Sequence, residues 1–526
     1  MSTRPVLQPP RASFPSAGAQ PAVLRPGWLG YPRGTWLIIG VEFWERFSFY
    51  GMLAILALFL AGDVGHGGFG WSSSQALGLV GAYSGAMYAF PAFGGYLADR
   101  VLGRRRAVTL GASVMLLGQI LTASPAYLPA LLGWWHRAPL LGALRSLGVP
   151  LGQLSRGPAV SVAIAEHGAS IDRVDGIAWL SEAYSASAFG FYAALLLLVV
   201  GNALMKSTLV VLCSETFNPD DPRREGAFAY YYLGISVGAM LSGFAVGVAS
   251  ERFGWPYGFG AAAVGMAVSL SLYLLLGPRW LGNIGARGAV SFDLQQAAVA
   301  AIPARTASGE SRRRIVLVLV LAGLMCTFSI GWFQMFGSWS LFIEHSVDRS
   351  VGSFIVPVAW FSSINAAVVI LIAPAIAALW VHLAARSTRI DIVQKYFFAI
   401  CMAALANVLM YLSGLLTVHG AQAPLWMPLV GVALLGFGEI VAWTATYGFV
   451  SRAAPAGFAS VTMGAWYLLT LGLGGYLSGV TGKWVDSLGF TETFGGIAAL
   501  MALGAATGLT LRTPLTRLAA RANVSL

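Results

Sequence analysis

The sequence predicts an all-α polytopic membrane protein with twelve transmembrane helices, because of its composition and its repeated apolar stretches. Hydrophobic residues make up 57% of the 526 residues and charged residues only 10%, and the mean hydropathy is +0.72. A soluble globular chain carries roughly 25% charged residues, so this chain cannot cover itself with a water-facing surface. Apolar stretches of roughly 20 residues, the length that spans a bilayer, recur along it. Backbone groups in hydrocarbon must pair within their own segment, and the spans are therefore expected to be helices.

Six spans are expected on either side of a polar stretch at residues 277–314. The first six are Thr35–Ala61, Ala76–Ala98, Ala107–Ala123, Ala186–Cys213, Phe228–Ala249 and Trp255–Leu276. The second six are Ile315–Phe336, Phe354–Leu383, Tyr396–Leu416, Pro424–Val450, Val461–Val480 and Phe494–Leu511.

This six-plus-six arrangement is typical of two helix bundles related by a pseudo-two-fold axis. We divide the chain into a disordered basic cytoplasmic arm (1–34), an N-terminal six-helix bundle (35–276), a cytoplasmic linker (277–314), a C-terminal six-helix bundle (315–511) and a cytoplasmic tail (512–526). The long mixed segment at 124–185 is expected to be an extracytoplasmic insertion, forming a small cap or amphipathic helices on the membrane surface.

Basic residues gather in the loops on one side of the expected bundle. They are Arg4, Arg11, Arg25, Arg33, Arg100, Arg104, Arg105, Arg106, Arg223, Arg224, Arg312, Arg313, Arg314, Arg386, Arg389, Lys395, Arg512, Arg517 and Arg521. The positive-inside rule places this side, with both termini, in the cytoplasm, and we expect an inner or plasma membrane location. Much of the net charge of +11 is explained in this way. Because these residues sit in short loops, nucleic acid is not an expected partner. A transit peptide is the alternative interpretation of the basic arm.

Three ionisable residues lie together inside the first span. Glu42, Glu45 and Arg46, followed by Tyr50, are spaced so that they share one helix face. Ionisable groups inside a membrane are costly and are functional candidates by default. A buried carboxylate prefers to be neutral, whereas a nearby arginine favours its ionised form. The cluster could therefore take up and release one proton as solvent access changes. The alternative is a fixed salt bridge that locks helices together.

Two further charges lie deep in later spans. Lys206, in the fourth span, needs a partner or must lose its proton; the first-span carboxylates or a substrate carboxylate could be that partner. Snorkelling is disfavoured because Lys206 lies several residues from either end of its span. Glu439 is the deep charge expected in the second half, and it could bind a substrate amine or remain protonated and inert.

An ordered set of motifs resembles one transporter family. The loop Gly94–Arg105 resembles the loop that controls gating in the major facilitator superfamily. Glu42-x-x-Glu45-Arg46-Phe47-Ser48-x-Tyr50-Gly51 resembles the ExxER motif of the proton-dependent oligopeptide transporters (the POT or PTR family), a branch of that superfamily. Further segments resemble the same family: Tyr88-x-x-Pro91, Lys206, Asn218–Arg224, Tyr231–Ala239, Val347–Arg349, Pro357–Asn365, Gly438-Glu439 and Gly464-x-Trp466. The set is more specific than any one motif.

The chain departs from the family's pattern at several of these positions. Phe49 stands where the family has a second tyrosine, and Leu53 where it has an arginine. Gln334 replaces the seventh-helix glutamate that is thought to pair with that arginine at the outer gate. Ser236 replaces an asparagine, and Lys206 is followed by Ser-Thr in place of Pro-Asn. Joint loss of the gate arginine and glutamate strands no charge, but it puts ordinary peptide specificity in doubt.

The resemblance implies a major facilitator fold and proton-coupled symport of di- or tripeptides by alternating access, with the cargo near the midplane. It implies a coupling role for Glu42, Glu45, Arg46 and Lys206. It implies that the substrate is bound by Tyr50, Tyr88, Lys206, Gln334, Asn365, Glu439 and Trp466. We expect no cofactor besides the coupling proton, no resident metal, and a monomer in the bilayer.

Other functions are open at this point. A transporter of the same fold could carry a modified peptide or another small amphiphilic molecule, even as an exporter, and Leu53 and Gln334 favour this alternative. An enzyme would need a catalytic His, Cys or Ser set near a span end. The six histidines have no partner motif, and the three cysteines lie in apolar spans without metal or disulfide spacing, so an enzyme is not expected. A sensor that binds its ligand without transporting it is a further alternative.

Overall fold

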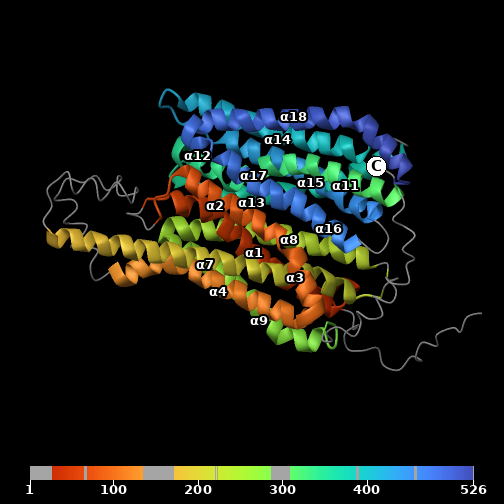
Figure 1. Cartoon of the computed structure of the whole chain (residues 1–526), viewed down its shortest axis with the longest axis horizontal. Helices are drawn as coiled ribbons and strands as arrows, with labels where there is room; N and C mark the ends of the chain where they lie inside the picture. The colour runs from red at the N-terminus through yellow and green to blue at the C-terminus, as the bar shows by residue number, and fades with distance from the viewer. Residues whose placement is uncertain are drawn as a thin grey trace, which may run out of the picture.

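The computed structural model describes residues 27–63, 68–133, 171–218, 221, 223–285, 309–386, 390–454 and 459–524. These residues form a bundle of long helices that run along one axis (Figure 1). Among them, eleven helices are long and apolar enough to cross a membrane. The segment Ala459–Gly482, which a π-helical turn interrupts, supplies the twelfth. The expected all-α, twelve-helix architecture is confirmed.

The helices of the first half follow the expected order. They are η2 (Trp28–Gly30), α1 (Arg33–Ala61), α2 (Ser73–Ala89), α3 (Pro91–Leu97), the π-helical turn η4 (Ala98–Leu102), α4 (Arg104–Gly133), α7 (Ile171–Glu215), α8 (Arg223–Phe253) and α9 (Trp255–Trp280). A glycine makes the sharp turn from α8 to α9, because Gly254 has φ +98°, a conformation that side chains with a Cβ rarely adopt.

The second half contains α11 (Gly309–Phe333), η7 (Gln334–Phe336), α12 (Ser338–Ser346), α13 (Trp360–Ala385), α14 (Ile392–Thr417), α15 (Trp426–Ala453), α16 (Ala459–Tyr467), η8 (Leu468–Gly472), α17 (Leu473–Gly482) and α18 (Val485–Arg521). Short strands connect some of these helices. β1 (Val347–Asp348) pairs in parallel with β4 (Ala423–Pro424), and β2 (Ser350–Val351) pairs antiparallel with β3 (Phe354–Ile355).

The structure corrects several expected boundaries. α4 continues to Gly133 and α7 begins at Ile171, so both helices extend into the segment expected to be a separate insertion. α18 likewise continues to Arg521, into the expected tail. The eighth span was expected from Phe354, but that residue lies in β3 and the helix begins at Trp360. Pro357 accounts for this difference, since a proline keeps the preceding residue extended. The expectations for residues 1–26, 134–170 and 286–308 lie outside the described residues.

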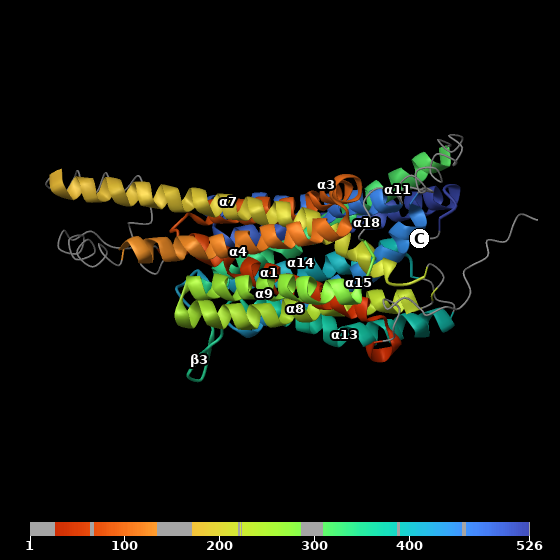
Figure 2. The ribbon, with the colours of Figure 1, turned by 90° about the horizontal axis from the view of Figure 1, so that it is seen from below.

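The two halves occupy different parts of the bundle. In Figure 1 the helices of the second half, coloured green to blue, lie mainly above those of the first half. The C-terminus and α3 lie at one end of the bundle, while α4, α7 and the β2–β3 hairpin extend at the other (Figure 2). We call this second end, where α1 finishes and α2 begins, the distal end.

Close helix contacts join the halves near the distal end. A methyl group on Gly81 of α2 would collide with the backbone of Gly479 on α17, and one on Gly479 would collide with Gly81 in return. Gly243 of α8 faces the backbone of Ala359, at the start of α13, in the same way. Residues without side chains let helix backbones approach closely. The halves are therefore packed together at this end.

Candidate functional site

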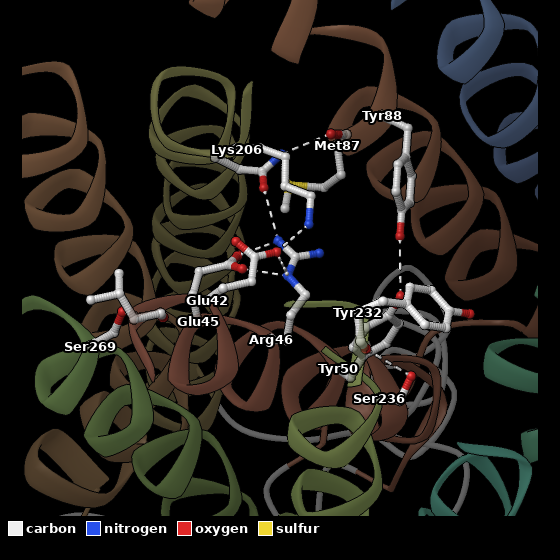
Figure 3. Close-up of polar contacts among 12 residues, drawn as sticks. Glu42, Glu45, Arg46, Tyr50, Met87, Tyr88, Lys206, Tyr232, Ser236 and Ser269 are labelled. Atoms are coloured by element: carbon white, nitrogen blue, oxygen red, sulfur yellow. Dashed lines mark hydrogen bonds and ion pairs between the residues drawn. The ribbon is translucent and has the colours of Figure 1, made fainter. Parts of the chain in front are cut away.

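A buried ion cluster on α1 forms one wall of the candidate site. Arg46 donates from Nε and Nη2 to the two carboxylate oxygens of Glu45, and its Nε lies 3.5 Å from Oε1 of Glu42. All three residues are at most 2% exposed. One turn of helix separates Glu42 from Arg46, so the periodicity that placed them on one face also places them in contact. The cluster is shown in Figure 3.

Lys206 brings α7 into the same cluster. Its Nζ donates to Oε1 of Glu42 at 2.5 Å, and its side chain is 23% exposed whereas that of Glu42 is fully buried. In Figure 3 Lys206 and Arg46 converge on the two carboxylates from different helices. Lys206 therefore balances the negative charge that the α1 residues alone would carry, and the group of four is neutral when every member is ionised.

Asn202 ties this cluster to a third helix. It lies one turn before Lys206, accepts from Nη2 of Arg46 at 3.3 Å, and donates to the carbonyl of Met87 on α2 at 2.8 Å. Sequence reasoning missed it, although a polar amide in an apolar span is a visible signal. The second oxygen of Glu42, Oε2, and the Tyr231 hydroxyl have no hydrogen-bond partner within the described residues.

A cavity between the halves begins at this cluster. The first half contributes Arg46, Tyr50, Tyr88, Lys206, Tyr232 and Ser236 to its lining. The second half contributes residues that include Trp332, Phe336, Asn365, Glu439, Trp443 and Tyr467. The cationic side chains thus belong to one half, and the carboxylate of Glu439 belongs to the other. A ligand in this cavity would touch both halves at once.

Glu439 on α15 is the acidic group of the second wall. Its Oε2 accepts from Nε1 of Trp332 on α11 at 2.8 Å. Gly438, the preceding residue, faces the carbonyl of Ala399 at close range, which lets α15 pack tightly against α14. In the part of the chain that the structure describes, Glu439 forms no ion pair.

The tyrosines and Asn365 supply neutral polar groups to the cavity. The hydroxyls of Tyr50 and Tyr88 lie 3.4 Å apart, and the Tyr50 ring is stacked on Phe336 of the other half with centroids 6.1 Å apart. Asn365 donates to the carbonyl of Val432 at 3.1 Å through Nδ2, so its Oδ1 can accept from a ligand. Figure 3 shows Tyr50, Tyr88, Tyr232 and Ser236 together on one side of the ion cluster.

Two residues expected at the substrate lie elsewhere. Gln334 is 1% exposed and does not line the cavity. Its Nε2 donates to the Ser478 carbonyl at 3.1 Å and to Thr481 at 2.9 Å, so it joins η7 to α17 within the second half. Trp466 is fully buried next to Tyr396, with ring centroids 6.3 Å apart, and it too is outside the lining. An aromatic residue in an apolar span gives no sign of which neighbour it faces.

The aromatic residues that line the cavity were missed for the same reason. Trp332, Trp443 and Tyr467 border the cavity, yet none of them was expected there. Their spacing is that of any apolar helix face, so the sequence does not distinguish a cavity wall from a lipid-facing surface. Among the described residues, no three His, Cys, Asp or Glu side chains gather in a way that could hold a metal ion.

Comparisons with known proteins agree with this architecture. The sequence profile of the POT family matches residues 105–309 and 289–495. The uncharacterized transporter YclF of Bacillus subtilis is 25% identical over 502 residues, which cover 87% of this chain and 89% of YclF. The peptide transporter YePEPT of Yersinia enterocolitica is 26% identical over 535 residues, covering 91% of this chain and 93% of YePEPT.

A solved structure supports the fold. The crystal structure of a peptide transporter POT in complex with sulfate has a TM-score of 0.74, at 22% identity, and the match covers 94% of this chain and 96% of that one. At this identity the likeness shows the fold alone, and it agrees with the major facilitator fold expected from the sequence. The named relatives are transporters and not enzymes. Because the family profile covers most of the chain, this multi-pass membrane protein belongs to the POT family.

Proposed function

We propose that the protein is a proton-coupled symporter that carries di- and tripeptides by alternating access, as a monomer and without a cofactor. The observation that carries the proposal is the distribution of charge over one cavity. Lys206 and Arg46 line it from the first half, and Glu439 lines it from the second. Membership of the POT family and the likeness to YePEPT, named as a peptide transporter, support the choice of cargo.

A zwitterionic peptide matches these two walls. Its ammonium group would pair with Glu439 and donate a further hydrogen bond to Asn365 Oδ1, while its carboxylate would pair with Lys206. Tyr50 and Tyr88 would donate hydrogen bonds to the peptide group between them. Because the two ends of the peptide contact different halves, binding favours closure of the halves around it. A ligand shifts a conformational equilibrium only when it binds one conformation more tightly than the other, and contacts to both halves at once provide that difference.

The proton is proposed to act on the ion cluster. Lys206 contacts Glu42 at 2.5 Å, so a cargo carboxylate must compete with Glu42 for the lysine. Protonation of Glu42 or Glu45 weakens the hold of the cluster on Lys206 and Arg46 and leaves Lys206 able to engage the cargo. Movement of this charge across the membrane is worth about 2.3 kcal/mol per 100 mV, which can drive accumulation.

The distal end is proposed to be the extracytoplasmic one, because the basic loops lie at the opposite end. Gly81 and Gly479 then close the protein toward the outside. In alternating access the α2–α17 contact would separate to admit cargo, and contacts at the other end would form.

Uptake into proteoliposomes tests the proposal. Labelled dialanine and an imposed inward proton gradient would be used with the wild-type chain, Lys206→Ala and Glu45→Gln. We expect the wild type to accumulate dialanine, a protonophore to abolish accumulation, and both variants to lose proton-driven accumulation. Intact proton-driven accumulation in Glu45→Gln would contradict the coupling step. No dialanine uptake by folded wild-type protein would contradict the cargo.

A different cargo of the same fold is the second candidate. The neutral side chains of Leu53 and Gln334 favour this candidate. The amide of Gln334 donates hydrogen bonds to the Ser478 carbonyl and the Thr481 hydroxyl, and it carries no charge that protonation could change. This candidate would be selected if small amphiphilic amines without a peptide group compete for the cavity and peptides do not.

A further inference from the structure

The charges around the cavity do not balance. In the described part of the chain the ion cluster contributes two carboxylates, Glu42 and Glu45, and two cations, Arg46 and Lys206. Glu439 adds a third carboxylate from the opposite wall. With every group ionised, the site therefore carries one net negative charge. An uncompensated charge in the low-dielectric interior of a membrane protein is costly, so the site favours a state with one additional positive charge.

The unbalanced group is Glu439. Arg46 and Lys206 each contact a carboxylate of the protein, whereas the described contacts of Glu439 consist of one neutral hydrogen bond from Trp332 at 2.8 Å. A cargo carboxylate must share one of these two cations with a carboxylate of the protein. A cargo cation displaces nothing when it approaches Glu439. The resting site is therefore better prepared for a cation than for an anion.

Aromatic rings line the cavity to which Glu439 contributes its carboxylate. Trp332 meets Phe336 edge to face with centroids 5.4 Å apart, and Trp443 is stacked on Tyr467 at 6.3 Å. All four rings line the cavity together with Glu439. The face of an aromatic ring attracts a cation within about 6 Å of its centroid, and groups of rings bind quaternary ammonium ions that cannot donate hydrogen bonds. The wall thus suits an ammonium group with carbon substituents.

We propose that the same cavity carries organic monocations that lack a carboxylate, and carries them without a coupled proton. This inference rests on the transport function proposed above. A zwitterionic peptide adds no net charge, so the loaded site becomes neutral only when one carboxylate is also protonated. A monocation neutralises the site by itself, and a proton taken up with it would leave one excess positive charge. The cargo class is an ammonium ion with apolar or aromatic substituents and no acid group.

Two matched probes test the inference. N,N,N-trimethylphenylalaninamide is a permanent monocation, and N,N,N-trimethylphenylalanine is the corresponding zwitterion. Each is labelled and offered, beside labelled dialanine, to proteoliposomes that hold the full chain, an inside-negative potential of about 100 mV and a trapped pH dye, without a pH gradient. We expect the monocation to accumulate by up to about 50-fold, the equivalent of 2.3 kcal/mol per 100 mV, without acidifying the interior. The two zwitterions should acidify it as they enter.

Variants connect the result to the residues. Glu439→Gln removes the unbalanced charge and should abolish accumulation of the monocation. Trp332→Leu should weaken competition by the monocation against dialanine uptake. Trp426→Leu is the matched control, because Trp426 lies at the start of α15, is 55% exposed and is outside the cavity lining, and it should leave both uptakes unchanged.

The outcomes separate this inference from the proposed function. Dialanine uptake without monocation uptake overturns the inference and leaves peptide symport standing. Monocation uptake without dialanine uptake supports the inference and contradicts the peptide cargo. Entry of the monocation together with interior acidification overturns the charge argument. Failure of every probe to enter through folded protein overturns both.

Discussion

Asn202 is the residue whose loss should most directly disturb the ion cluster without removing a charge. It joins Arg46 to the carbonyl of Met87 through two hydrogen bonds. We expect Asn202→Leu, a change of similar volume, to lower the unfolding midpoint of the purified protein in detergent. The variant leaves a guanidinium N–H and a carbonyl unpaired in a buried site, and each such group costs about 1–3 kcal/mol.

The control for this prediction is Thr507→Val on α18. Thr507 is exposed and its hydroxyl bonds only to the carbonyl one turn earlier, so its loss should change stability by less than about 0.5 kcal/mol. Tryptophan fluorescence during heating measures both variants. An Asn202→Leu midpoint no lower than that of the control would show that Asn202 does not support the cluster.

At the residue scale, what could be predicted depended on the chemistry of the side chain. Glu42, Arg46 and Lys206 were identifiable because a charge in an apolar span is rare and costly. Trp332 and Trp443 were not identifiable, because aromatic side chains occur at lipid-facing, core and cavity-lining positions alike. Gln334 was assigned to the substrate by resemblance alone, and the structure uses its amide within the second half.

Among the contacts between the two halves, the one between α2 and α17 leaves no room for a single added carbon atom. A Cβ on Gly81 would collide with the Gly479 backbone, which cannot move aside as a side chain can. We expect Gly81→Ala to disfavour distal closure by about 1–3 kcal/mol, the cost of overpacking, which corresponds to about a 5- to 150-fold shift in the equilibrium. Transport should slow, because the cycle requires this closure.

Accessibility of a buried position measures this shift. Ser84 of α2 is 1% exposed and packs beside Gly475 of α17, so Ser84→Cys should react slowly with an impermeant maleimide. Adding Gly81→Ala should raise the labelling rate. Gly78→Ala is the matched control on the same helix, since a Cβ there would meet only the flexible end of Lys483. Equal rates for the two alanine variants would contradict the close-contact argument.

At the scale of elements, the existence of each helix was predictable, but its ends and its irregular turns were not. Long apolar stretches fix where a span must lie, because an unpaired backbone is not tolerated in hydrocarbon. They do not fix where a helix stops once it leaves the bilayer, and α4, α7 and α18 all extend past their expected ends. The π-helical turn at Leu468–Gly472 has no apolar signature of its own.

At the scale of the whole molecule, the position of the basic loops and the closed distal end together predict how the protein is oriented in the membrane. The distal end is closed by backbone contacts, and the opposite end holds the basic loops. An ion pair and a hydrogen bond across the halves reinforce the distal contact: Arg349 donates to Glu251 of α8 at 3.1 Å, and the backbone amide of Ser74 on α2 donates to Asp486 of α18 at 3.1 Å. A protein built in this way and oriented by its basic loops would be closed toward the outside in this state.

That orientation is itself testable, and it decides which way the proposed cycle runs. We expect an epitope inserted at Gly352, the exposed turn between β2 and β3, to be reached by antibody on intact cells or spheroplasts. An epitope after Leu526 should be reached only after permeabilisation. The positive-inside rule keeps the basic loops in the cytoplasm, and the C-terminus lies at the same end as these loops (Figure 2). An insertion in this turn should leave the bundle intact, since the hairpin extends beyond it (Figure 2). The reverse pattern would place the closed end at the cytoplasm, and the proton-loading step would then have to begin from the other side.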